Sequence, residues 1–223
     1  MRKLATLLCV LLAAVALPAT AAAVGSDEAA AGLKVALQQG AGKAIALLGK
    51  QDGFFGNPDV HIPLPGVLQK GRKTLDKLGL KKQTAALDLA INRAAEAAVP
   101  QARQLFADAI GRMSLSDALG ILKGPDDAAT QYFRASMTAP LTEAFLPIVG
   151  RNTAQLDLAK KYSAVATKAA DLGLVEQQDA SLDAYVTRKA LDGLFLVMAR
   201  EEAAIRKDPL GQANALLKEV FGQ

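Results

Sequence analysis

The chain is short of the residues that most often carry catalysis or cross-link small proteins. It contains one cysteine, Cys9, one histidine, His61, and no tryptophan. A single thiol cannot form an intramolecular disulfide, and one histidine without further thiols cannot build a typical zinc site. Aromatic residues make up only 4% of the chain, which leaves few side chains for stacking on nucleic-acid bases. These absences remove several common classes of site before any motif is considered.

Recognisable catalytic motifs are absent as well. The sequence contains no G-x-S-x-G, no H-E-x-x-H and no glycine-rich phosphate-binding loop. Asp52-Gly53 and Asn57-Pro58-Asp59 offer oxygen ligands, but their spacing does not match an EF-hand loop. We therefore assign no catalytic residue, no metal and no cofactor.

The N-terminus has the pattern of a secretory signal peptide. Two basic residues precede an apolar run from Leu4 to Leu17, which is shorter than a membrane span. Small residues follow, and Ala21 and Ala23 fit the usual cleavage pattern. We predict cleavage after Ala23, or alternatively after Ala21, and location in the periplasm; a retained N-terminal anchor is the competing interpretation. Cys9 lies too early for a lipoprotein cysteine.

The charge of the chain gives little indication of a partner. The formal net charge is +4, and Arg2 and Lys3 supply two of the positive charges. The remaining basic residues look interleaved with acidic ones, without a polybasic block, so nucleic-acid binding is not expected. No later segment reaches transmembrane length without charges. The oligomeric state is left open.

The rest of the chain is predicted to be an all-α, single-domain bundle of about eight or nine helices over residues 24–223. Alanine and leucine dominate, and no stretch alternates with the period of a strand. About 200 residues can bury roughly 70% of their unfolded surface without disulfides. Helices are expected over about 26–49, from Pro65 to Leu78, from Lys81 to Met113 with a kink or break at Pro100, from Ser114 to Lys123, from Pro125, from Pro140, from Asn152 to Gly173, from Ser181 and from Asp208.

One long irregular segment interrupts the helices. Residues 50–66 contain several glycines and three prolines, which exclude a regular helix. Loops of this length in a compact domain are usually functional or packed down. Phe54, Phe55, Ile62 and Leu64 provide apolar side chains with which the segment can pack.

Four ordered blocks resemble one bacterial family. They are DGFFGNPDVHIPLP (52–65), NRAAE (92–96), GPDDAATQYFR (124–134) and DAYVTRKALDGLF (183–195). Together they are similar to an exported family catalogued as domain of unknown function 4197. The resemblance spans almost the whole chain after the signal peptide and implies a helical envelope protein. It supplies no catalytic residues.

Polar residues within these blocks form our candidate binding cluster. Mid-helix asparagine is unfavourable, so such a residue faces water or completes a buried network. We predict a network that either holds helices in register or lines a polar pocket. Its members are Asn92, Arg93, Glu96, Asp126, Asp127, Arg134 and Asp192.

Structural interpretations compete with these functional ones. Asp126 and Asp127 follow Pro125 and are expected in the first turn of a helix, where acids are favourable. Arg134 shares a helix face with Asp126, which favours an internal salt bridge. Gly193 inside an apolar helix favours close helix packing.

Three classes of function remain open. The leading one is a non-enzymatic periplasmic protein that binds an apolar or lipid-like molecule, or a protein partner in the envelope. The second is a hydrolase or lyase that uses Asp126, Asp127 and Glu96 as acid or base. The third is a purely structural envelope protein.

Overall fold

The computed structural model describes residues 25–155, 159–160, 162 and 181–207, and its regular elements there are all helices. The all-α prediction is therefore confirmed for the described residues, whereas the count of eight or nine helices is not. The elements are α1 (Ser26–Leu48), α2 (Gly66–Lys77), α3 (Lys81–Ala98), the 3₁₀ turn η1 (Val99–Gln101), α4 (Ala102–Arg112), α5 (Leu115–Leu122), α6 (Ala128–Thr153) and α8 (Leu182–Lys207).

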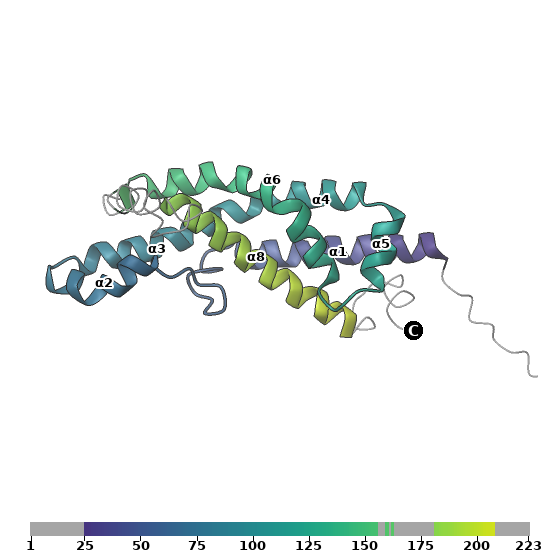
Figure 1. The fold of residues 1–223 in the computed structure, drawn as a ribbon, viewed down its shortest axis with the longest axis horizontal. Coiled ribbons are helices and arrows are strands. Elements are labelled where there is room, and N and C mark those ends of the chain that lie inside the picture. Colours follow the sequence, from purple (N-terminus) through teal and green to yellow (C-terminus); the bar gives the residue numbers. More distant parts are fainter. Residues whose placement is uncertain (1–24, 156–158, 161, 163–180, 208–223) are drawn as a thin grey trace, which may run out of the picture.

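The long helices lie along one axis and share one core (Figure 1). Helix α6 packs on α3 and α8, and α1 packs on α8, α4 and α5. Phe106 meets Phe133 and Phe195 edge-on, with ring centroids 5.4 and 6.4 Å apart. These contacts bring α4, α6 and α8 together. The hairpin of α2 and α3 projects from one end of the molecule.

Proline has different consequences in η1 and in α6. At Pro100 the predicted break is present, because α3 ends at Ala98 and η1 separates it from α4. The helix start predicted at Pro140 is wrong, since Pro140 and Pro147 both lie inside α6. A buried stripe at four-residue spacing runs through α6 past both prolines: Phe133, Met137, Leu141, Phe145 and Val149. Burial of this stripe offsets the roughly 3 kcal/mol that an interior proline costs.

Other predicted helix ends differ from the structure in detail. Asn152 does not cap a helix but lies within α6, where its side chain donates to the Ile148 carbonyl. Ser26 is the first residue of α1, and Gly25 occupies the cap. The helices expected towards Gly173 and from Asp208 lie outside the described residues.

A capping box precedes α5, as the pattern Ser114-Leu115-Ser116-Asp117 predicts. The Ser114 hydroxyl accepts from the Asp117 amide at 3.1 Å, and Asp117 accepts from the Ser114 amide at 3.2 Å. The Ser114 hydroxyl also donates to the Asp117 carboxylate. This hydrogen bond, followed by the one from the Ser114 amide, lowers the pKa of Asp117. The box therefore fixes the start of α5. Tyr132 lies near the box, and its pKa is raised, first by burial and second by the negative charge of Asp117.

The predicted irregular segment occupies residues 49–65, between α1 and α2, and is called the connecting loop below. It packs into the core, because Phe54, Ile62 and Leu64 are each almost fully buried. Gly53 allows the sharp turn after α1, since a Cβ there would lie 2.5 Å from the Leu48 carbonyl oxygen. The loop is thus part of the packed structure.

Candidate functional site

Glu96 of α3 holds the first half of the connecting loop. One carboxylate oxygen accepts the backbone amides of Phe54 and Phe55, each at 3.0 Å. The other accepts from Arg93 Nη1 at 2.6 Å. Glu96 is only 4% exposed, so these hydrogen bonds replace those it would make with water. The buried charge is matched by an adjacent guanidinium.

Asn92 holds the second half of the loop, because its side-chain amide pairs with both the N–H and the C=O of one loop residue, as a neighbouring β-strand would. Its Oδ1 accepts from the Ile62 amide at 2.8 Å, and its Nδ2 donates to the Ile62 carbonyl at 2.9 Å. The same Nδ2 donates to the Asp88 carbonyl of its own helix at 2.9 Å. The buried amide therefore satisfies both backbone groups of one loop residue.

Arg93 links Glu96 to Asp52 on the outer side of the connecting loop. Its guanidinium bonds Asp52 at 2.7 Å as well as Glu96, and it lies 5.7 Å from the centre of the Phe55 ring. The hydrogen bond to Glu96, followed by that to Asp52, raises the pKa of Arg93. Asn92, Arg93 and Glu96 do converge, but they converge on the loop backbone.

Helix α8 holds the opposite side of the loop. The Tyr185 hydroxyl donates to the Pro63 carbonyl at 3.0 Å, and Arg200 pairs with Asp59 at 2.5 Å. A Cβ on Gly193 would lie 2.8 Å from the Phe54 ring. Gly193 therefore permits close packing, as predicted, although its neighbour is the loop and not another helix.

Asp192 and Arg134 form a second group, on the surface between α6 and α8. Arg134 bonds Asp192 at 3.3 Å and lies 4.7 Å above the Phe195 ring. Arg188 and Lys189 approach the same carboxylate at 3.6 and 3.9 Å. Each of these side chains is substantially exposed, so each pair contributes at most about 1 kcal/mol. Three cations thus surround one carboxylate.

Asp126 and Asp127 join neither group. Helix α6 begins at Ala128, so both acids precede the first turn in which they were predicted. Asp127 occupies the cap position without a side-chain cap and accepts from Gln131 Nε2 at 2.8 Å. The predicted pair of Asp126 with Arg134 is not formed, because Arg134 contacts Asp192. Within the described residues, the predicted network is divided into separate groups.

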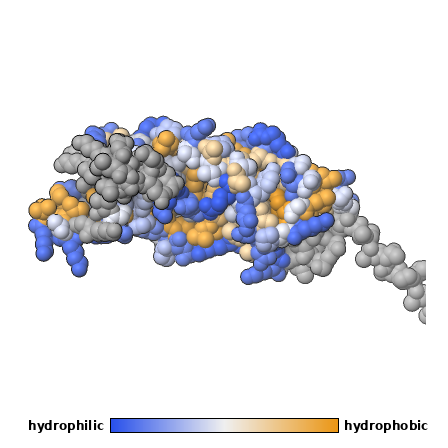
Figure 2. Space-filling view, in the orientation of Figure 1, coloured by the Kyte–Doolittle hydropathy of each residue, from blue (hydrophilic) through white to orange (hydrophobic). Residues whose placement is uncertain are grey.

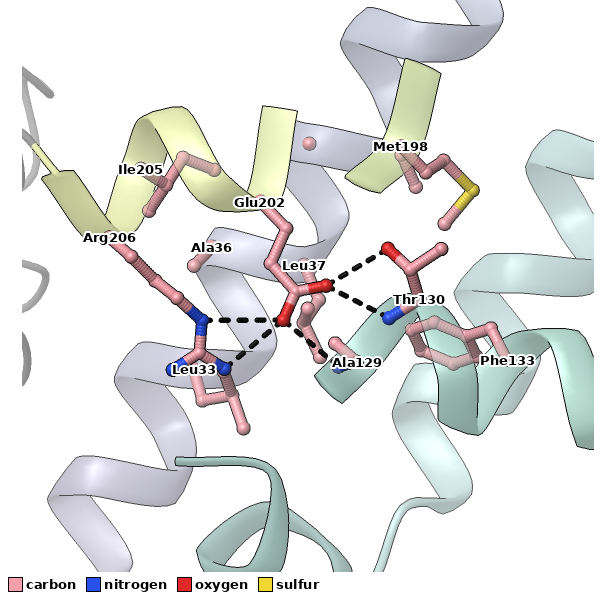
Figure 3. A pocket seen from close by; sticks show the side chains of 12 residues that line it. Leu33, Ala36, Leu37, Ala129, Thr130, Phe133, Met198, Glu202, Ile205 and Arg206 are labelled. Atoms are coloured by element: carbon pink, nitrogen blue, oxygen red, sulfur yellow. Dashed lines mark hydrogen bonds and ion pairs between the residues drawn. The ribbon is translucent and has the colours of Figure 1, made fainter. Parts of the chain in front are cut away.

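A residue that the sequence analysis did not select stabilises the start of α6 (Figure 3). Glu202 of α8 accepts the amides of Ala129 and Thr130 and the Thr130 hydroxyl, each at 2.9 Å. Arg206 bonds Glu202 at 3.1 Å and the Ile121 carbonyl of α5 at 2.9 Å. The four-residue spacing of Glu202 and Arg206 could have predicted their ion pair from the sequence. It could not have predicted their contacts with α6 and α5, which are distant in the chain.

Two surface hollows flank Asp192. The first, which we call the α6–α8 groove, has a volume of about 280 Å³ and is lined by Arg134, Thr138, Thr142, Leu146, Ala184, Thr187, Arg188, Leu191, Asp192 and Phe195. The second, about 180 Å³, lies between the connecting loop and α8 and includes His61 and Lys189. A much smaller cavity of about 20 Å³ adjoins Glu202 and has room for about one water molecule.

Thr187 is the unusual residue of the α6–α8 groove. It is 1% exposed, and its hydroxyl has no hydrogen-bond partner within the described structure. Thr138 and Thr142, on the facing helix, instead donate to carbonyls of their own helix. Among the described residues, no three metal-binding side chains cluster, and no helix is both long and apolar enough to cross a membrane.

These features define a helical protein with an anchored surface loop and a groove between two long helices. The chain belongs to the family described as protein of unknown function (DUF4197), whose model matches residues 23–222. The suggested resemblance is thereby confirmed. Comparison with curated proteins and with solved structures gave no match.

Proposed function

We propose that the protein is a non-enzymatic binding protein whose α6–α8 groove takes a small amphipathic molecule with an anionic head. The observation that carries the proposal is the Thr187 hydroxyl, which is buried in the wall of the groove and has no hydrogen-bond partner among the residues that the structure describes. An unsatisfied buried hydroxyl costs about 1–3 kcal/mol. Because the hydroxyl is covered in the unliganded protein, a ligand oxygen would recover part of that cost once the lining of the groove shifts to admit it.

The lining of the groove supports this class of ligand. Leu146, Leu191 and Phe195 provide apolar contacts, while Arg134 and Arg188 stand on either side of a single carboxylate. The excess of positive charge favours an anion, and guanidinium groups bind carboxylates and phosphates well. The volume of about 280 Å³ is at the lower end for ligand pockets, so a short acyl chain fits better than a complete phospholipid.

The proposal includes export to the periplasm. The basic N-terminal residues, the apolar run from Leu4 to Leu17 and the small residues up to Ala23 support a cleaved signal peptide. Residues 24–223 would then form one domain that meets its ligand, or an envelope protein partner, outside the cytoplasm.

The two alternatives have weaker support. For a carboxylate hydrolase or lyase, both oxygens of Glu96 are already bonded, and Asp126 and Asp127 lie in another part of the structure. A purely structural role would account for the anchored loop. It does not account for the Thr187 hydroxyl, which lacks a partner within the described part of the chain.

Substitution of Thr187 by valine separates binding from packing, because valine keeps the shape and removes the hydroxyl. We expect Thr187→Val to raise the free energy of unfolding of the unliganded protein by about 1 kcal/mol. We also expect it to weaken binding of a medium-chain fatty acid, such as decanoate, about fivefold. Chemical denaturation and isothermal titration calorimetry measure the two effects.

Thr153→Val is the matched control. Thr153 is equally buried, but its hydroxyl donates to Asp183 at 2.5 Å, so the substitution should destabilise the protein without changing decanoate affinity. Native mass spectrometry of the purified protein would show any ligand carried from the cell. The proposal fails if neither decanoate nor a co-purified amphiphile binds, or if Thr187→Val leaves binding unchanged.

A further inference from the structure

The projecting end of the α2–α3 hairpin concentrates the positive charge of the protein. Residues 66–82, called the α2–α3 tip below, contain six lysines and arginines and one acid, Asp76. The remainder of the chain has 20 cationic and 21 anionic residues, so its formal charge is close to zero. The +4 net charge of the chain thus resides in this one segment.

The cations of the tip are available to a partner. Five of them are exposed: Arg72, Lys73, Lys77, Lys81 and Lys82. None has a carboxylate within 4.0 Å in the described part of the chain, in contrast to the paired cations around Asp192. Like charges crowded on one short hairpin repel each other. A negatively charged surface would remove that repulsion.

An exposed leucine lies among these charges. Leu78 follows α2 directly and is 69% exposed, more than any other large hydrophobic side chain described. Gly79, with a φ of 77°, then reverses the chain into α3. At the same end of the molecule, Figure 2 shows hydrophobic residues at the extremity bordered by hydrophilic ones. The tip therefore combines exposed cationic side chains with one exposed leucine, Leu78.

The shape of the tip indicates the kind of partner. It is a projection, built from α2 packed on α3, and its exposed cations line none of the hollows described above. It contains no aromatic residue, so it has no platform for stacking nucleic-acid bases. A flat anionic surface can contact all the cations at once, and a fluid one can accept a leucine.

We infer that the α2–α3 tip binds the surface of membranes that contain anionic phospholipids, with Leu78 entering the headgroup layer. Each lysine or arginine close to such a surface strengthens binding about fivefold. Binding through the tip, which lies at one end of the molecule, would hold the bundle with its long axis pointing away from the bilayer (Figure 1). This inference is independent of the ligand proposed for the groove.

Vesicle co-sedimentation of the full chain provides the first test. We expect binding to vesicles of phosphatidylcholine with phosphatidylglycerol to exceed binding to phosphatidylcholine alone, and to fall as salt is raised. The triple variant Lys77→Gln, Lys81→Gln, Lys82→Gln should lose about 100-fold in affinity for the anionic vesicles. The matched control is Lys50→Gln, Lys160→Gln, Lys207→Gln, which removes three exposed lysines elsewhere and should bind as the original chain does. All variants keep the N-terminal apolar run, so its contribution is common to them.

The absence of tryptophan permits a direct test of insertion. Leu78→Trp introduces the only tryptophan of the chain, and its fluorescence should shift to shorter wavelength on adding anionic vesicles. Leu115→Trp places the reporter at another exposed leucine, on α5, and should show no shift.

Three results would overturn the inference. One is equal binding to neutral and anionic vesicles; another is equal loss of binding in the two triple variants. The third is a tip-dependent dimer, or a complex with an acidic protein, in the absence of any anionic-vesicle binding.

Discussion

At the scale of single residues, Gly193 sets how closely α8 approaches the connecting loop. We expect Gly193→Ala to lower the free energy of unfolding by about 1 kcal/mol. A Cβ would lie 2.8 Å from the buried Phe54 ring and 3.2 Å from Val60 Cβ, and such overpacking outweighs the better helix propensity of alanine. Thermal or urea denaturation would measure the change.

Gly42→Ala is the control for that substitution. Gly42 also lies inside a helix, but a Cβ there would meet nothing within 4 Å. Its replacement should therefore stabilise α1 by up to about 1 kcal/mol. If both substitutions stabilise the protein, the close contact of α8 with the loop is not a constraint.

Sequence reasoning identified several important residues but missed their long-range partners. Asn92 and Glu96 were selected because polar residues among alanines need a reason, and both prove to be buried. Their partners are backbone groups of the loop, about 30 and 42 residues away. A helical pattern identifies which side chains share a face; it carries no information on which distant amide lies opposite.

At the scale of elements, the connecting loop depends on α3 for its conformation. We expect Glu96→Ala to destabilise the protein by roughly 3 kcal/mol, because the Phe54 and Phe55 amides would be left unpaired in a largely buried site. Chemical denaturation would measure the loss. Faster hydrogen exchange at these two amides would locate it.

The control for Glu96 is an exposed glutamate on a neighbouring helix. Glu143 of α6 is exposed and makes no ion pair within the described residues, so Glu143→Ala should change stability by less than about 0.5 kcal/mol. Comparable losses in the two variants would contradict the anchoring role of Glu96.

Proline shows where a local rule fails for a whole helix. The rule that proline ends a helix held at Pro100 and failed at Pro140. At Pro140 the apolar stripe of α6 continues with the same spacing on both sides, and it packs against α3 and α8. Packing energy summed over the helix exceeded the local cost.

At the scale of the whole molecule, Glu202 and Arg206 join the end of α5, the start of α6 and α8. We expect Glu202→Ala to cost about 3–5 kcal/mol, since it removes the carboxylate that faces buried donors of α6 and Arg206. Denaturation would measure the loss, and hydrogen exchange would place it at the first turn of α6.

The adjacent acid supplies a control on the same helix. Glu201 is partly exposed and pairs with Lys43 at 3.8 Å, so Glu201→Ala should cost no more than about 1 kcal/mol. A Glu202→Ala loss as small as that would show that α6 does not depend on the contact.

The concentration of positive charge in residues 66–82 is already present in the sequence, because six of these 17 consecutive residues are basic and one is acidic. The expectation of interleaved charges missed it. What the structure adds is that this stretch forms one projecting hairpin (Figure 1).

The sequence by itself determined the all-helical class, the irregular segment between the first two helices, the break at Pro100 and the capping box before α5. These follow from periodicity, proline and glycine placement and contacts within a few residues. Only the tertiary structure decided that Asn92 and Glu96 hold a loop and that Glu202 caps α6. It also decided that the Thr187 hydroxyl lies in a groove with no partner among the described residues. Each of those facts depends on which distant backbone or side chain comes close, and local interactions cannot specify that.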